Sequence, residues 1–94
     1  MSCNFLARFR IKPEKEQDFI ALVALMEANS KDEPDTLAYK FFRLSEPGMF
    51  AVYESFTSEA GDLAHMQNPA NVALIDAMLA CMDGSYSREY LYDL

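Results

Sequence analysis

The residues in this sequence best suited to chemistry are one histidine and a glutamate that precedes it. His65 is the only histidine in the chain, and an imidazole can accept a proton near neutral pH. Glu54 lies in an alternating run, on the same side as Phe50 and Val52, where a charge is costly unless it is paired. A carboxylate can orient a histidine and stabilise its charged form, so the two residues could form a general base. They could equally be a structural pair that ties a strand to a helix.

The segment from Met49 to His65 predicts a strand followed by a helix. Alternating side chains over Met49–Phe56 are typical of a strand with one buried face. Thr57 or Ser58 is suited to cap the next helix, because a short hydroxyl side chain can accept a hydrogen bond from the first turn. Glu54 then lies on the strand and His65 on the helix. The two can meet only if the helix packs on the sheet.

The N-terminal half predicts a strand, a helix and a second strand. Alternation marks the two strands, and apolar residues at helical spacing mark the helix. These segments are Asn4–Ile11, residues 13–30 and Thr36–Leu44. A Ser-Glu-Pro-Gly turn follows, so Thr36–Leu44 and Met49–Phe56 form an antiparallel hairpin. The acidic residues of the loop Asp32–Asp35 are interpreted as solvated.

The C-terminal half predicts a broken helix and a last strand. Asn68-Pro69 ends the helix that carries His65, and Asn68 caps a second helical segment. The last strand is expected at Ser85–Tyr92. The order β-α-β-β-α-β is the α+β, ferredoxin-like split βαβ arrangement, a four-stranded antiparallel sheet with helices on one face. Depending on which residues face the helices, the other face carries Leu6, Phe42 and Leu44 or a comparable aromatic set. A second subunit packed sheet to sheet would cover it, so we expect a homodimer.

Length and composition indicate a single domain over residues 1–94. The net charge is −7 and the basic residues are dispersed, so neither nucleic acid nor an anionic membrane is an expected partner. No apolar run approaches the length of a membrane span. Cys3 and Cys81 fit no metal spacing and no signal peptide is recognisable, so we expect a cytoplasmic protein with two free thiols. One histidine gives little basis for a metal site.

Four motifs together resemble a known family. They are FRIKPEKEQDF, DEPDTLAY, VYESFTSEAGDLAH and NPANVALI. In this order and spacing the chain resembles the antibiotic biosynthesis monooxygenase (ABM) domain, over nearly its whole length. The resemblance implies a dimeric α+β barrel. It also implies, for some members, cofactor-free oxygenation of quinols or polyphenols, whereas many other members have no known activity.

The resemblance also assigns positions. His65 matches the family's histidine after the third strand, and Glu54 matches the acid of its middle motif. Glu33-Pro34 and Tyr39 match the loop and strand before it.

Three positions depart from the family pattern. Phe56 replaces a frequent Trp, and Asp35 stands where Gly often follows Glu-Pro. Ile75 lies near the position of the haem-ligating histidine of haem-degrading relatives, so haem degradation is disfavoured.

We therefore expect a cofactor-independent monooxygenase that acts on a small quinol or polyphenol. Such a site must remove a proton from the substrate, stabilise the resulting oxyanion and exclude water. His65 would be the base and Glu54 its orienting partner, with no metal or other cofactor. The candidate substrate-binding residues are Tyr39, Tyr53, Phe56 and Asn4. The alternatives are a non-catalytic module that binds a small aromatic or lipid-like molecule, and a dimeric interaction domain with a filled core.

Overall fold

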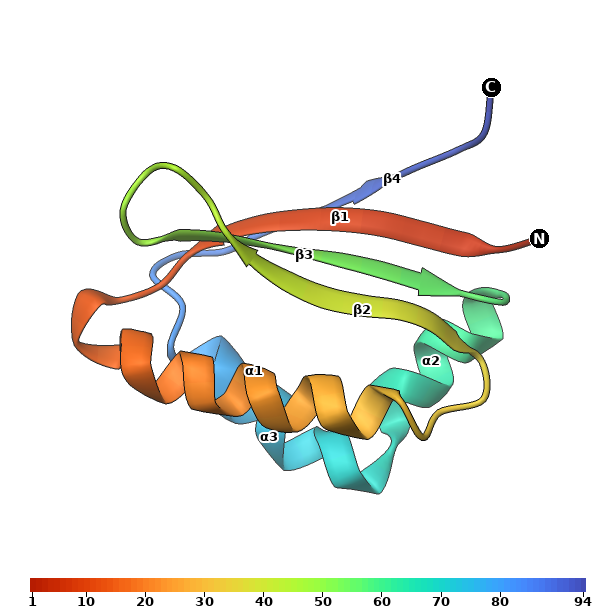
Figure 1. The fold of residues 1–94 in the computed structure, drawn as a ribbon, viewed down its shortest axis with the longest axis horizontal. Helices are drawn as coiled ribbons and strands as arrows, with labels where there is room; N and C mark the ends of the chain where they lie inside the picture. The colour runs from red at the N-terminus through yellow and green to blue at the C-terminus, as the bar shows by residue number, and fades with distance from the viewer.

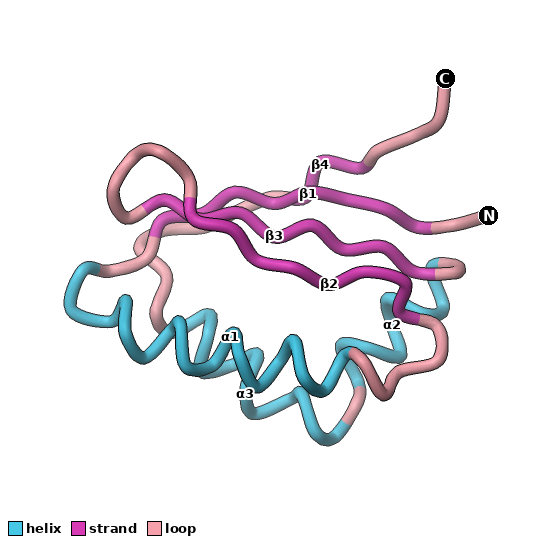
Figure 2. Tube along the Cα trace, in the orientation of Figure 1, coloured by secondary structure: helices cyan, strands magenta, loops and turns pink.

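The alternating segments form a four-stranded antiparallel sheet, and the helical segments cover one of its faces (Figures 1 and 2). This arrangement is seen in a computed structural model that describes residues 1–94. The strands, β1 (Cys3–Arg10), β2 (Thr36–Arg43), β3 (Met49–Phe56) and β4 (Arg88–Tyr90), lie in the order β2-β3-β1-β4. The helices are η1 (Pro13–Lys15), α1 (Glu16–Ser30), α2 (Glu59–Gln67) and α3 (Pro69–Ala80). The predicted ferredoxin-like α+β fold is confirmed.

The turns and breaks read from proline and glycine are confirmed. Gly48 has a φ of +84° in the β2–β3 turn, the conformation that glycine adopts without steric cost. The break at Pro69 separates α2 from α3, and the side chain of Asn68 accepts a hydrogen bond from the N–H of Ala70. The capped start of α3 therefore forms as the sequence indicates.

The last strand is shorter than predicted. Only Arg88–Tyr90 forms β4, whereas Ser85–Tyr92 was expected. The N–H of Asp83 donates to the carbonyl of Arg10, and pairing with β1 resumes only at Arg88. β4 is an edge strand that pairs only with β1. Alternating tyrosines in the sequence are therefore not enough to extend its pairing over the whole predicted range. The C-terminal residues extend away from the sheet (Figure 1).

The core lies between the sheet and helices α1 and α3. Phe19 of α1 packs edge to face with Phe9 and Phe50, at ring-centroid distances of 5.6 Å and 5.3 Å. The strand register places Glu54 opposite both Phe5 of β1 and Tyr39 of β2. Residues opposite each other share a face of the sheet, so Glu54 points to the helix side.

The other face of the sheet has no helix over it (Figure 1). It carries the first of the two alternative residue sets, with Leu6 opposite Tyr53 and Phe42 opposite Ala51. Phe42 is 47% exposed. An apolar face of this kind is a candidate protein interface.

Both cysteines are free, as predicted, and both are buried. Among the helices, none is both long enough and apolar enough to cross a membrane.

Candidate functional site

Helix α2 holds His65 against the sheet. Ser58 lies at its N-cap in an extended conformation, but its hydroxyl does not make the predicted capping hydrogen bond, and Glu59 is in the first turn. Gly61 allows close approach, because a Cβ at this position would lie 3.0 Å from Asp35 Cβ and 3.2 Å from the Cβ of Phe56. This close packing places the His65 side chain, which is almost fully buried, under the end of the sheet.

The ring of His65 is held between two aromatic residues. Its centroid lies 4.6 Å from that of Tyr39 and 5.5 Å from that of Phe56. Both neighbours were predicted as substrate-binding residues, and the structure brings both to His65. Tyr39 also lines the cavity described below, whereas Phe56 packs outside that lining.

The ring is oriented by Glu33, in the loop before β2. His65 Nδ1 lies 2.8 Å from Glu33 Oε1. The carboxylate also accepts hydrogen bonds from Thr36 Oγ1 at 2.9 Å, Asn68 Nδ2 at 2.8 Å and Asn71 Nδ2 at 2.7 Å. The interpretation of this loop as wholly solvated is therefore wrong for Glu33, whose side chain is only 11% exposed.

These contacts determine which nitrogen of His65 carries the proton. Burial alone would raise the pKa of Glu33, but hydrogen bonds from His65, Asn68 and Thr36 outweigh it and lower that pKa. Glu33 is thus an ionised acceptor near neutral pH. Nδ1 faces this carboxylate at hydrogen-bond distance and must donate to it, so in the neutral ring Nε2 is the unprotonated nitrogen.

Asn71 completes the network from the start of α3. It is fully buried, and its amide donates to Glu33 Oε2 and, at 3.0 Å, to the carbonyl of His65. Its Oδ1 accepts a hydrogen bond from Asn29 of α1 at 3.2 Å. The buried amide is therefore satisfied on every side, as a buried polar group must be, and it ties both α1 and α2 to α3.

Glu54 faces the other ring nitrogen. Its Oε1 lies 3.9 Å from His65 Nε2, which confirms that strand and helix bring the pair together. This distance is too long for a hydrogen bond, so the bond that orients the ring comes from Glu33 instead of Glu54. Burial raises the pKa of Glu54 to about 8. Arg88 opposes this effect, while the charges of Asp62 and Glu33 add to it.

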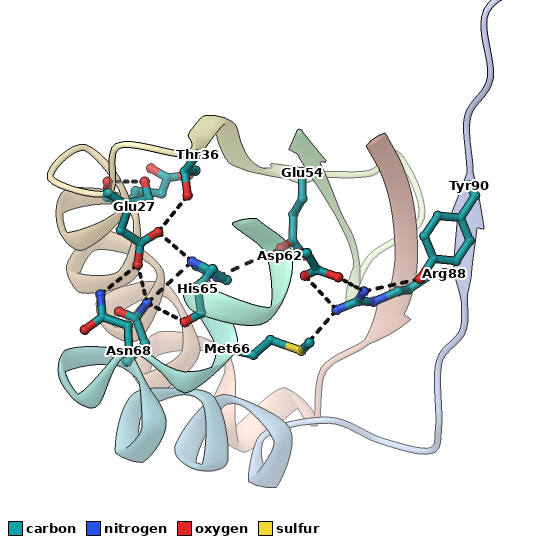
Figure 3. A network of polar contacts seen from close by, with 12 residues as sticks. Glu27, Thr36, Glu54, Asp62, His65, Met66, Asn68, Arg88 and Tyr90 are labelled. Carbon is teal, nitrogen blue, oxygen red and sulfur yellow. Dashed lines mark hydrogen bonds and ion pairs between the residues drawn. The ribbon is translucent and has the colours of Figure 1, made fainter. Parts of the chain in front are cut away.

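Arg88 of β4 is the side chain whose positive charge opposes the rise in the pKa of Glu54. Its Nη1 and Nη2 lie 2.5 Å and 3.3 Å from the two carboxylate oxygens of Asp62 on α2 (Figure 3). Its guanidinium also stacks 4.0 Å from the ring centroid of Phe5. Burial disfavours the charge, but hydrogen bonds to Asp62 and Tyr90 raise the pKa of Arg88. The ion pair therefore ties β4 to α2 at the edge of the site.

A small cavity of about 80 Å³ lies beside His65 and Glu54. Most of its lining residues are aromatic or aliphatic, among them Phe41, Ile75 and Met78, and its polar side chains include those of His65, Glu54 and Arg88. The volume is several times what one water molecule needs. An apolar lining with a few convergent polar groups is the usual composition of a small-molecule site, although the volume here is below the usual range for such sites.

The other two predicted substrate-binding residues lie elsewhere. Asn4 and Tyr53 point to the opposite face of the sheet, where Asn4 accepts a hydrogen bond from Ser55. They are not brought to His65. For Tyr53 this could have been predicted from the sequence, because neighbouring side chains of a strand point to opposite faces and Tyr53 is next to Glu54.

Glu33, Asn68 and Asn71 were not predicted as site residues. Two signals in the sequence point to them. Glu33-Pro34 lies in the loop just before β2. Asn68 and Asn71 are three positions apart at the N-terminal end of α3, which places them on the same side of that helix. Neither signal predicts that Glu33 contacts His65 and these asparagines, because the contacts join segments that are far apart in the chain.

The chain matches the family model for antibiotic biosynthesis monooxygenases over residues 5–77. It is similar to the structure of a candidate antibiotic biosynthesis monooxygenase from Caulobacter crescentus CB15, with 26% identity, a TM-score of 0.89 and coverage of 99% of this chain and 90% of that one. A candidate member from Nitrosomonas europaea has 16% identity, a TM-score of 0.90 and coverage of 99% and 90%. SnoaB, a cofactor-independent oxygenase from Streptomyces nogalater, has the same fold at 13% identity, a TM-score of 0.81 and coverage of 98% and 92%. No curated protein matches significantly.

The matched residues include Glu54 and His65, which line the cavity, and Glu33, which binds His65 on the other side of the ring. They end before β4, so Arg88 lies outside them. The match spans well over half of the sequence and agrees with the fold. The chain therefore belongs to the antibiotic biosynthesis monooxygenase family.

Proposed function

We propose that this protein is a cofactor-independent monooxygenase that acts on a small quinol or polyphenol, with His65 as the base. The observation that carries the proposal is the position of His65 Nε2. This nitrogen is free of protein hydrogen bonds and lines an apolar cavity, while Nδ1 is held by Glu33. A tautomer fixed in this way presents a proton acceptor to a bound hydroxyl.

The chemistry is supplied by the substrate. His65 takes a phenolic proton, and the resulting phenolate reduces dioxygen, so that a carbon–oxygen bond forms and gives a ring hydroperoxide. Loss of the ring proton then breaks the O–O bond, which leaves an oxygenated quinone and one water. The substrate provides all the electrons. The protein has to bind the ring, accept the proton and exclude water.

Oxygen uptake tests the proposal. We expect purified protein to consume oxygen with at least one member of a panel of small benzene and naphthalene quinols, without added flavin or metal. The rate must exceed autoxidation of the same quinol in buffer. Thermal stabilisation by a quinol without oxygen uptake would instead support a non-catalytic binding module of the same fold.

We also propose that the protein is a homodimer, joined through the sheet face that no helix covers. Leu6, Phe42 and Tyr53 lie on this face, and sheet-to-sheet packing would remove them from water. At micromolar concentration, sedimentation should give twice the 10.7 kDa chain mass. Phe42→Glu should shift the mass toward one chain, whereas Leu25→Glu, on the exposed side of α1, should not. A monomeric wild type at this concentration would contradict the proposal.

A further inference from the structure

His65 and Glu54 present two unused polar atoms to one small cavity. Nε2 and Oε1 are 3.9 Å apart, and neither makes a hydrogen bond within the protein. A ligand oxygen about 2.8 Å from each atom fits this spacing. The site is therefore built to hold one oxygen atom between an imidazole and a carboxyl group.

The surroundings of Glu54 keep its carboxyl group neutral near physiological pH. Its side chain is only 12% exposed, and burial is the main cause of its raised pKa of about 8. Arg88, whose charge would lower this pKa, is already paired with Asp62. The titratable groups around Glu54 and its cavity are Cys3 on β1, Tyr39 on β2, Arg88 on β4, Asp62 and His65 on α2, Glu33 in the loop before β2, and Tyr86 in the segment before β4.

We propose that a phenolic hydroxyl binds between these atoms, donating to His65 Nε2 and accepting a hydrogen bond from the protonated carboxyl of Glu54. This inference rests on the proposed function, and it assigns Glu54 a role other than orienting the imidazole. A hydroxyl is suited to the site because it can donate once and accept at the same time.

The arrangement also explains how the oxyanion would be stabilised. When the phenolic proton moves to Nε2, the substrate oxygen becomes negative and the imidazole becomes positive. Glu54 keeps its own proton throughout and continues to donate to the same oxygen. A hydrogen bond to an ionised acceptor is shorter and stronger than one to a neutral acceptor, and exclusion of water strengthens it further. Glu54 would therefore favour the deprotonated substrate over the neutral one.

The ligand class follows from this pair and from the cavity. It is a small neutral aromatic ring with one hydroxyl directed at the His65–Glu54 edge and with apolar surface elsewhere. Ionised Glu54 would be an acceptor, as Nε2 is. One hydroxyl proton cannot serve two acceptors, so one of the two hydrogen bonds would be lost.

The test measures the binding of 4-methylphenol by NMR titration between about pH 7 and about pH 9.5, below the ionisation of a phenol near pH 10. For the wild type, we expect affinity to fall by about three- to tenfold as the pH passes about 8, the loss of one hydrogen bond. For Glu54→Gln, the amide N–H donates at every pH, so affinity should stay flat. Glu14→Gln, an exposed change near the start of α1, should keep the wild-type fall.

Three results would overturn the inference: no binding of 4-methylphenol, a flat wild-type profile, or an unchanged fall in Glu54→Gln. Oxygen uptake separates this inference from the proposed function. Quinol oxidation with a flat binding profile would refute only the role of Glu54. The expected binding profile without oxygen uptake would support the hydroxyl site and refute the oxygenase.

Discussion

Replacing His65 with glutamine is expected to lower the rate of oxygen uptake with a quinol by about 10²–10⁴-fold, the usual contribution of a general base. Glutamine can still donate a hydrogen bond to Glu33, so much of the network is kept. It has no group that accepts a proton near neutral pH. The measurement is the initial rate at saturating quinol, with autoxidation subtracted.

A structural role for His65 predicts a different pattern. His65→Ala leaves a space between Tyr39 and Phe56, where added imidazole can bind. Imidazole should restore part of the lost rate if His65 is the base, and the rate should rise with imidazole concentration. Gln67→Ala, an exposed change on the same helix, should leave the rate unchanged. An unaltered rate in His65→Gln would show that His65 is not the base.

The strands and breaks were predictable because their causes are local. The alternation of β3 and the positions of Pro47, Gly48 and Pro69 act through neighbouring residues. The meeting of Glu54 and His65 followed from the order of the elements, since α2 must cover the sheet beside β3. These features need no knowledge of distant partners.

The role of Glu33 was not predictable in the same way. Its contacts to α2 and α3 join segments that are more than thirty positions apart, and an acid in a polar loop looks the same whether it is solvated or buried. Arg88 is similar, because its partner Asp62 lies on another element. Burial and hydrogen bonding decide these roles, and both depend on how the helices pack.

Glu54→Gln is expected to stabilise the protein at neutral and alkaline pH. Burial raises the pKa of Glu54 from about 4.5 to about 8 in the folded state. Between these values the unfolded chain loses the proton and the folded protein keeps it, so folding stability falls as the pH rises. Above about pH 8 both states are ionised, and the folded state carries a cost on the order of 3–5 kcal/mol. Glutamine is neutral throughout and avoids this cost.

The pH dependence separates this effect from a general change in packing. Denaturant unfolding of the two proteins should give equal free energies below about pH 4, where Glu54 is neutral in both states. The difference should grow up to about pH 8 and then level off. Glu33 has the opposite sign, because its pKa is lowered, and its contribution is lost in acid. Both proteins share that loss, so it cancels in the difference. A difference that is constant with pH would mean that folding does not raise the pKa of Glu54.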